Sequence, residues 1–306
     1  MSLKLAFCLF AYRPFRGLQR DFFHIASACT QRGHAVVVYT MEWRGPIPAD
    51  FDVHLLPVRQ LRNHARSKGF AAALARETAH REFDVVTGFN RIPGLDVYFA
   101  ADPCYAARVR ELHGPLYRLS SRYRHFAAAE QAIFGPDADT RILLLSEAEI
   151  KKFCYHYQTR PGRFRLLPPG ISRDRRVPAD AAVKRADFRR EHGVGEDERV
   201  VLLVGSGFRT KGLDRAIRAL AGLPPALGQR SRLLVVGEDN ARPFLRLARQ
   251  LGIAGRVHFM QGRADVQRFM LGADLLLHPA RSELAGMVLL EAVIAGLPVL
   301  ATDVCG

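Results

Sequence analysis

The strongest constraint on the fold is a regular alternation of short apolar runs with helical stretches. An apolar run at Leu3–Phe10 is followed by an amphipathic stretch at Gly17–Arg32 and by a second apolar run at Val36–Thr40. Buried parallel strands read as nearly continuous hydrophobic segments, and helical crossovers join them into βαβ units. The chain is therefore predicted to be an α/β protein built on parallel sheets.

The alternation is interrupted once, at Pro168-Pro169-Gly170 and in the charged, irregular segment that follows. It resumes with a helical stretch at Ala181–His192 and continues to an apolar run at Pro298–Thr302. Breaks of this composition are typical of domain boundaries, and 306 residues suffice for two separate cores. We predict two Rossmann-like, doubly wound domains, at residues 1–169 and 170–306.

The net charge indicates that the partner is anionic but does not identify its class. The 45 Lys and Arg residues exceed the 30 Asp and Glu residues, for a formal net charge of +15. A field of this sign attracts nucleic acid, anionic lipid and phosphorylated sugars. A basic nucleic-acid-binding protein is the alternative class, but no helix-turn-helix, zinc-finger, RRM or KH signature accompanies the charge. We therefore expect no nucleic-acid partner.

Cysteine usage and hydropathy point to the cytoplasm. The five cysteines are odd in number and have no C-x-x-C spacing, which is typical of reduced thiols. The apolar start at Leu3–Phe10 has no cleavage site and is predicted to be a strand, not a signal peptide. No run approaches the roughly 20 apolar residues of a membrane-spanning helix. Any membrane contact is expected to be peripheral.

One segment carries most of the functional information. It lies between a predicted strand at Asp274–His278 and a predicted helix at Gly286–Ala295 and reads Glu283-Leu-Ala-Gly286-Met287-Val288-Leu-Leu-Glu291. A helix N-terminus offers unpaired N–H groups and a positive dipole end to a diphosphate, and a glycine there admits close approach. The two glutamates are spaced to bracket a bound sugar diphosphate, not to act as a paired acid and base. The simpler interpretation is a dipole-stabilised acid followed by a surface glutamate.

Further motifs resemble a known family. Glu291 is followed by Ala292-Val-Ile-Ala-Gly296-Leu-Pro298-Val, and the first half contains five stretches with the same family pattern. These stretches are Pro14-Phe-Arg-Gly17-Leu-Gln-Arg-Asp21, Gly88-Phe-Asn90, Pro93-Gly-Leu-Asp-Val-Tyr-Phe-Ala-Ala-Asp102, Ser121-Arg-Tyr-Arg-His125 and Leu167-Pro-Pro-Gly-Ile171. The sequence resembles the family 4 glycosyltransferases, and among them the lipopolysaccharide core glucosyltransferases of the WaaG type.

The resemblance implies a GT-B fold, in which the two domains face each other across a cleft. It also implies a UDP-hexose donor that is held mainly by the second domain. Glu283 would then contact the sugar hydroxyls at the catalytic centre, and Glu291 would contact the ribose. Both glutamates are therefore predicted to be site residues.

The same resemblance assigns the remaining donor contacts. A cation after the Pro-Pro-Gly turn and a lysine in a Lys-Gly turn hold the family's diphosphate, and they correspond here to Arg175 and Lys211. Two cations neutralise a leaving UDP without a metal ion. The other predicted donor contacts are Gly17, Gly286, Met287 and Val288. From the residues alone, Lys211 could equally face solvent, and Gly17 could form an ordinary turn.

Two positions depart from the family pattern. Arg209 stands two residues before Lys211, whereas adjacent Arg-Lys is expected in the family, so Lys211 is the better-supported contact. Arg16 stands beside Gly17 where the family usually carries a second glycine. An arginine there is expected to narrow the phosphate approach or to add a contact to it.

Asp102 follows the apolar run at Val97–Ala101 and precedes Pro103. The resemblance places this aspartate at the catalytic centre, where it is predicted to orient the acceptor hydroxyl or to accept its proton. An aspartate followed by proline also fits a helix N-cap with proline at the first helical position. Both interpretations stay open on the sequence.

A basic helical region is predicted between Cys104 and Phe134. In it Arg118, Arg122 and His125 recur at helical spacing beside the apolar residues Leu119, Tyr123 and Phe126. Such a helix can lie on anionic lipid, and the family uses this region to reach the inner membrane. We predict an anionic membrane surface as the partner around Arg118, Arg122 and Tyr123; the alternative is a solvated basic face over a buried stripe.

Together these features predict a retaining glycosyltransferase, peripheral on the cytoplasmic face of the inner membrane. It would move a hexose, glucose or a galactosamine-type sugar, from UDP to a heptose of the lipopolysaccharide inner core in α-1,3 linkage. No metal is predicted, because the histidines lack ligand spacing and no D-x-D follows a strand. One alternative is an epimerase on the same fold. Because the chain ends at Gly306, where a further helix is expected, an incomplete second domain and an inactive UDP-binding remnant are also considered.

Overall fold

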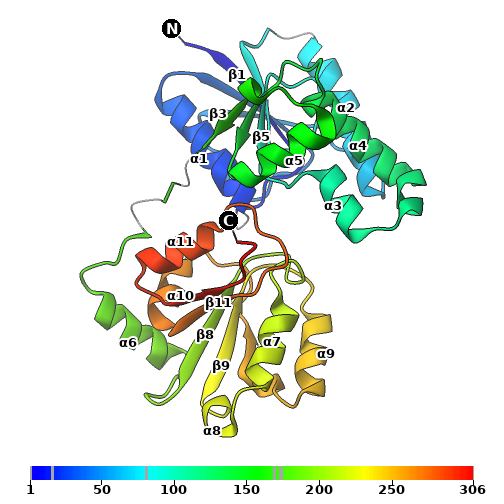
Figure 1. Ribbon diagram of the computed structural model, residues 1–306. Coiled ribbons are helices and arrows are strands. Elements are labelled where there is room, and N and C mark those ends of the chain that lie inside the picture. Colours follow the sequence, from blue (N-terminus) through cyan, green and yellow to red (C-terminus); the bar gives the residue numbers. More distant parts are fainter. Residues whose placement is uncertain (1, 15–16, 80–81, 168–169, 172–174, 306) are drawn as a thin grey trace. The chain divides into compact units, whose positions relative to one another are not determined.

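A computed structural model describes residues 2–14, 17–79, 82–167, 170–171 and 175–305. The chain divides into two compact units, the first from Met1 to Pro168 and the second from Pro169 to Gly306. This division falls one residue before the predicted boundary. Arg16 lies outside the described residues. Figure 1 shows the helices and strands of both units.

The first unit is a seven-stranded parallel sheet in the order β3-β2-β1-β4-β5-β6-β7. Its strands are β1 (Lys4–Leu9), β2 (Ala35–Thr40), β3 (Phe51–Leu55), β4 (Val85–Gly88), β5 (Val97–Ala100), β6 (Arg141–Leu144) and β7 (Phe164–Leu166). Its helices are α1 (Gly17–Gln31), α2 (Asn63–Ala79), α3 (Tyr105–Leu112), η1 (Pro115–Leu119), α4 (Ser121–Phe134), α5 (Glu147–Tyr157) and η2 (Pro161–Arg163).

The second unit is a five-stranded parallel sheet in the order β10-β9-β8-β11-β12. Its strands are β8 (Arg199–Val204), β9 (Ser231–Val236), β10 (Val257–Phe259), β11 (Leu275–His278) and β12 (Val299–Ala301). Its helices are α6 (Ala181–Glu191), α7 (Leu213–Ala221), α8 (Pro225–Gly228), α9 (Arg242–Gln250), η4 (Ala254–Arg256), α10 (Val266–Gly272) and α11 (Met287–Ile294). Both sheets are doubly wound, as the alternation predicted.

Each sheet is buried on both faces, which explains why its strands read as continuous apolar runs. Along β1, Ala6 and Cys8 pack into one hydrophobic cluster, whereas Leu5, Phe7 and Leu9 pack into the other. Successive side chains of a strand point to opposite faces, so an uninterrupted run supplies two cores at once. In the second unit Leu202 and Leu203 divide between two clusters in the same way.

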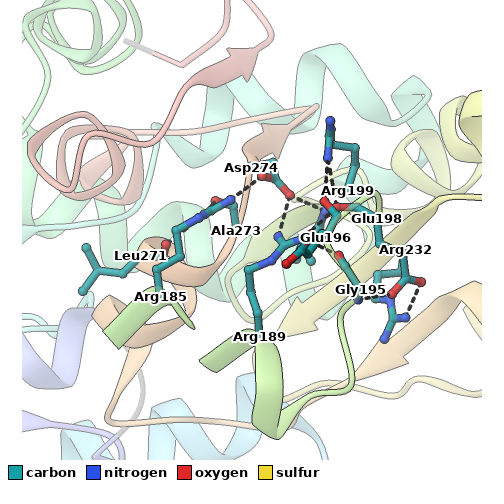
Figure 2. A network of polar contacts seen from close by, with 11 residues as sticks. Arg185, Arg189, Gly195, Glu196, Glu198, Arg199, Arg232, Leu271, Ala273 and Asp274 are labelled. Atoms are coloured by element: carbon teal, nitrogen blue, oxygen red, sulfur yellow. Dashed lines mark hydrogen bonds and ion pairs between the residues drawn. The ribbon is translucent and has the colours of Figure 1, made fainter. Parts of the chain in front are cut away.

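Aspartates that directly precede a strand align the amino ends of the sheets. Asp84 accepts the backbone N–H of Lys4 at 2.7 Å, and Asp274 accepts that of Val200 at 2.7 Å. Two arginines of α6 also hold Asp274, Arg185 at 2.5 Å and Arg189 at 3.2 Å (Figure 2). Burial would raise the pKa of Asp274, but the Val200 N–H and the Arg185 guanidinium lower it below its ordinary value. The opposite, carboxyl edge of each sheet carries the loops in which ligands of α/β proteins bind.

Candidate active site

The predicted donor residues Lys211 and Glu283 meet at the carboxyl edge of the second sheet. Lys211 lies in the loop after β8, and Glu283 lies in the loop between β11 and α11. The Lys211 Nζ donates to Glu283 Oε2 at 2.5 Å, and His278 Nε2, at the end of β11, lies 2.8 Å from the same oxygen. The Glu283 side chain is 13% exposed and that of His278 is fully buried. Sequence reasoning overlooked His278, because it searched the histidines only for metal-ligand spacing.

Two glycines let the loop around Lys211 fold this tightly. Gly205 has φ +140°, and a Cβ there would lie 3.2 Å from the Cγ and Cε of Lys211, whose stem crosses the glycine. Gly212 has φ +72°, and a Cβ there would lie 1.9 Å from the Pro279 carbonyl oxygen. The glycines therefore permit both a left-handed backbone and the close approach of the two site loops.

Arg281 fastens these two loops to each other. Its backbone N–H donates to the Thr210 carbonyl at 2.8 Å, and its guanidinium donates to the Arg209 carbonyl at 2.8 Å. The same guanidinium makes a bidentate pair with Asp214, with N···O distances of 2.7 and 2.6 Å. Bidentate pairs fix orientation as well as distance, so the Lys211 loop is held against the Glu283 loop.

The environment of Glu283 stabilises its ionised form. Burial by itself would raise the pKa of this carboxyl, but the hydrogen bond from His278 and the charge of Lys211 overcome that effect and lower the pKa to about 2. The site therefore holds a fixed carboxylate with a cation at hydrogen-bond distance. Such a pair can release its cation to an anionic ligand and keep an acceptor for hydroxyl groups.

The helix α11 begins at Met287, four residues after Glu283. Gly286 is its N-cap in a left-handed conformation, with φ 54° and ψ 29°, and it makes no side-chain cap. Met287 and Val288 form the first turn, where backbone N–H groups have no acceptor within the helix. A Cβ on Gly286 would lie 3.9 Å from Glu283 Cγ, so the helix start and the carboxylate are neighbours. Glu283, Gly286 and the first helical turn therefore adjoin one another, and their role in donor binding stays a prediction.

The other two predicted donor residues occupy different settings. Glu291 lies within α11 and is 7% exposed, so it is not the surface glutamate of the simpler interpretation. Arg175 is half-buried in the segment before α6. The contacts described above join Lys211, Glu283 and Gly286, and they include neither Glu291 nor Arg175.

In the first unit, Asp102 lies at the carboxyl end of β5 and is largely exposed. Its side chain is 54% exposed, and Oδ2 lies 3.9 Å from Nη1 of Arg91. The N-cap interpretation is wrong, because α3 begins at Tyr105 with Cys104 as its N-cap. Pro103 precedes the cap, so Asp102 stands two residues before the position from which a side chain accepts from the first turn. Gly17 is the first residue of α1.

The α3 N-terminus is capped instead by two buried glutamates from other helices. Glu130 of α4 accepts the N–H groups of Tyr105 at 2.9 Å and Ala106 at 3.1 Å, and Glu149 of α5 accepts that of Cys104 at 2.7 Å. Carboxylates are favoured at this end of a helix. These side chains fix the segment that carries Asp102, and sequence reasoning missed them.

Glu130 also holds an arginine behind Asp102. The Arg91 Nε lies 2.9 Å from Glu130 Oε1, and Tyr157 donates its hydroxyl to Glu130 Oε2 at 2.5 Å. Burial and the neighbouring Glu130 raise the pKa of Tyr157, so this hydroxyl stays a donor. Arg91 donates to the Pro103 carbonyl at 2.5 Å, which links the buried network to the residue after Asp102. The sequence signal that could have revealed Glu130 is a glutamate directly after the apolar run Phe126-Ala-Ala-Ala.

The basic helical stripe predicted between Cys104 and Phe134 is not continuous. The region forms α3, the 3₁₀ turn η1 and α4, and Ser120 restarts the helix by accepting the N–H of Tyr123 at 3.1 Å. Arg118 therefore lies in η1, on a different element from Arg122. Burial, together with the charges of His64 and Lys68, lowers the pKa of His125, so this residue carries a positive charge less readily than an ordinary histidine. The prediction of one stripe through these three residues was wrong.

The same region nevertheless exposes apolar side chains beside its arginines. Leu112, Leu116 and Leu119 are 63%, 79% and 70% exposed, and Arg118 and Arg122 are exposed near them. Among the described residues, no helix is both long enough and apolar enough to cross a membrane. Within the same part of the chain, no three His, Cys, Asp or Glu side chains gather so as to hold a metal ion. Metal-free chemistry stays a prediction.

Comparison with known proteins gives a consistent result over both units. Residues 15–175 match the family described as Glycosyltransferase Family 4, and residues 184–306 match that described as Glycosyl transferases group 1. The lipopolysaccharide glucosyltransferase WaaG of Escherichia coli (strain K12) is 50% identical over 302 residues, which are 99% of this chain and 81% of that protein. A D-inositol 3-phosphate glycosyltransferase of Mycobacterium sp. (strain KMS) is 34% identical over 188 residues, 59% of this chain and 40% of that protein.

Solved structures agree with these sequence relationships. A crystal structure of WaaG, 49% identical, matches with a TM-score of 0.95 over 99% of this chain and 82% of that chain. Anabaena Alr3699/HepE in complex with UDP-glucose matches with a TM-score of 0.74 at 20% identity, over 98% of this chain and 80% of that chain. The second likeness bears on the fold alone.

Proposed function

The chain belongs to the WaaG-type lipopolysaccharide core glucosyltransferases, within the family 4 glycosyltransferases of GT-B fold, and from that premise we propose its donor, acceptor and chemistry. It is a hexosyltransferase of lipopolysaccharide core biosynthesis. The proposed reaction moves glucose from UDP-glucose to a heptose of the inner core in α-1,3 linkage, with retention of the anomeric configuration. A galactosamine-type hexose is the alternative donor sugar.

The observation that supports this proposal most is the Lys211–Glu283 pair beside the N-terminus of α11. In the ligand-free pair each charge neutralises the other at 2.5 Å. A UDP-hexose brings a diphosphate, which competes for Lys211, and sugar hydroxyls, which can donate to Glu283. We propose that the lysine turns to the diphosphate while His278, 2.8 Å from the carboxylate, keeps Glu283 in place for the hexose.

The bond changes follow from this arrangement. The bond between the hexose C1 and the UDP oxygen breaks, and a bond from C1 to the acceptor oxygen forms on the same face of the sugar. The leaving UDP takes up negative charge, which Lys211, Arg175 and the N–H groups of Met287 and Val288 are proposed to stabilise. The acceptor hydroxyl loses its proton, and Asp102 is proposed to orient that hydroxyl or to accept the proton.

Two further contacts complete the proposed donor site. Glu291, buried within α11, is proposed to accept from the ribose hydroxyls, and Gly17 to let the start of α1 approach the donor. The proposed donor site requires no metal ion, because Lys211, Arg175 and the N-terminus of α11 supply the positive charge that the diphosphate needs. We therefore propose metal-free transfer.

Thermal stabilisation by nucleotides tests the donor and the metal-free chemistry together. UDP in EDTA should raise the melting temperature of the protein, whereas ADP and GDP at the same concentration should not, since a ligand stabilises only the state that binds it. A shift that disappears in EDTA would contradict the metal-free site. Transfer to core oligosaccharide from UDP-glucose and from UDP-galactosamine, with the product anomer assigned by NMR, then tests the sugar and the retention.

The region from α3 to α4 is proposed to rest on the cytoplasmic face of the inner membrane. Its exposed leucines and arginines, including Arg118 and Arg122, suit an anionic lipid surface. Replacing both arginines by glutamate should weaken binding to phosphatidylglycerol vesicles in low salt, because each basic residue contributes about 1 kcal/mol there. UDP binding should stay unchanged in the same variant. Equal vesicle binding by variant and parent would refute this part of the proposal.

A further inference from the structure

A pocket of the first unit lies between α3, η1 and α4. Its volume is about 340 Å³, and its lining includes Arg91, Arg108, Arg122, Tyr105, Tyr117 and Phe126. This volume is in the range of small-molecule sites. None of the donor residues discussed above lines this pocket.

The pocket carries an excess of positive charge. Arg91 is 13% exposed and is paired with Glu130, but Arg108 and Arg122 are exposed, and neither forms an ion pair with a carboxylate among the described residues. No Asp or Glu is among the lining residues. Guanidinium groups match carboxylate and phosphate oxygens in planar, bidentate geometry. The charge therefore favours an anionic occupant.

The walls of the pocket are aromatic. The Arg122 guanidinium lies 5.3 Å from the centre of the Phe126 ring, and the rings of Tyr105 and Phe126 are 5.6 Å apart. The hydroxyls of Tyr105 and Tyr117 are 3.4 Å apart. Aromatic faces pack on the C–H faces of sugar rings, and phenol hydroxyls supply hydrogen bonds to the sugar's own hydroxyls. The lining thus combines groups that bind an anion with groups that bind a sugar ring.

Arg91 connects this pocket to Asp102. Its Nη1 lies 3.9 Å from Asp102 Oδ2, and its Nη2 donates to the carbonyl of Pro103. We infer that the pocket binds an acidic sugar unit of the acceptor, bearing a carboxylate or a phosphate, beside the sugar that receives the hexose. The inference rests on the proposed function, because Asp102 marks the acceptor's position only in that function.

A pair of double variants with equal charge change tests this inference. R108Q/R122Q removes two positive charges from the pocket, and R110Q/R124Q removes two exposed charges from the same two helices outside it. R108Q/R122Q should raise the KM for core acceptor by about tenfold or more, the usual scale for lost charge-assisted bonds, with kcat and the donor KM within about twofold. R110Q/R124Q should leave all three within about twofold. An equal rise in both variants, or no rise in either, overturns the inference.

Direct binding separates this inference from the proposed function. Glucuronic acid and glucose 6-phosphate, titrated into the full chain and followed by NMR, should bind more tightly than glucose and should lose that preference in R108Q/R122Q alone. This result does not depend on transfer, so an inactive protein that keeps the preference would contradict only the proposed function. Each double variant removes two exposed basic side chains from the α3 to α4 region, so both should bind phosphatidylglycerol vesicles more weakly than the parent and to a similar extent. A vesicle defect confined to R108Q/R122Q, without any preference for acidic sugars, would assign the pocket to a lipid headgroup and overturn the inference.

Discussion

In the second unit Glu283 is 13% exposed and shares one oxygen with Lys211 and His278, whereas in the first unit Asp102 is 54% exposed and lies 3.9 Å from Arg91. In the second unit the Glu283 carboxylate is therefore ionised and already paired with Lys211. In the first unit Asp102 is exposed to solvent, and the network that fixes its segment, which includes Arg91 and Glu130, is buried. In the proposed function, a bound diphosphate must displace an existing ion pair in the second unit, whereas an acceptor hydroxyl meets an exposed carboxylate in the first.

The largest expected effect comes from Glu283→Gln. Turnover should fall about 10²- to 10³-fold, roughly 3–4 kcal/mol in the barrier, because the lost charge acts on the hexose as it develops positive charge. UDP itself should bind no more weakly than to the parent, since Lys211 loses the carboxylate that competes with the diphosphate. Steady-state kinetics and calorimetric titration of UDP measure the two quantities.

Glu291→Ala provides a contrast with Glu283→Gln, because Glu291 lies in α11, the helix that follows the loop of Glu283. UDP should bind this variant more weakly by about 1–3 kcal/mol, the usual value of hydrogen bonds to a charged acceptor, because UDP already carries the ribose. If Glu283→Gln lost UDP affinity as severely as Glu291→Ala, the division of roles between the two glutamates would be wrong.

Acid should remove a specific contribution to stability from the second unit. The pKa of Glu283 is about 2 in the folded state, below its ordinary value of 4.5, so the folded state binds this proton less readily than the unfolded state does. The contribution, about 3 kcal/mol, is fully present above pH ~4.5 and is lost as the pH falls to about 2.

The stability difference between the parent and Glu283→Gln reports this contribution. It should be constant from pH 7 to pH 5 in urea unfolding and should shrink at lower pH. A difference that stays the same down to pH 2.5 would show that the carboxylate is not held as the geometry implies, and the contrast with the solvent-exposed Asp102 would fail.

The same contrast explains what could be read from the sequence. Lys211, Glu283 and Gly286 lie in loops that directly connect a strand to a helix, and parallel strands bring such loops to one edge of a sheet. The periodic pattern therefore predicted that all three lie at one edge of the second sheet, and the resemblance to the family was needed to assign them to one site. His278 ends the apolar run of β11. A polar residue at the end of a buried strand is a signal for a site residue, but the histidines were considered only as possible metal ligands.

The first unit was harder because its network joins distant positions. Arg91 follows β4, Glu130 lies in α4 and Tyr157 ends α5, so no local spacing relates them. Helical periodicity also ran through Ser120, where a serine N-cap stops one helix and starts the next. Local patterns predict elements well, but a cap changes which residues share a face.

The smallest effect is expected for a substitution of Gly17 in the first unit, which contrasts with Gly212 in the second. Gly212 cannot be replaced without a clash, since a Cβ would lie 1.9 Å from a backbone oxygen, whereas a Cβ on Gly17 meets no atom within 4 Å. Gly17→Ala should therefore leave the free energy of unfolding unchanged or raise it by less than about 1 kcal/mol, because alanine favours helix over glycine. If the donor approaches the start of α1 closely, the KM for UDP-glucose should nevertheless rise severalfold in a protein of undiminished stability. An unchanged KM and kcat would make Gly17 an ordinary turn residue and would leave donor binding to the second unit.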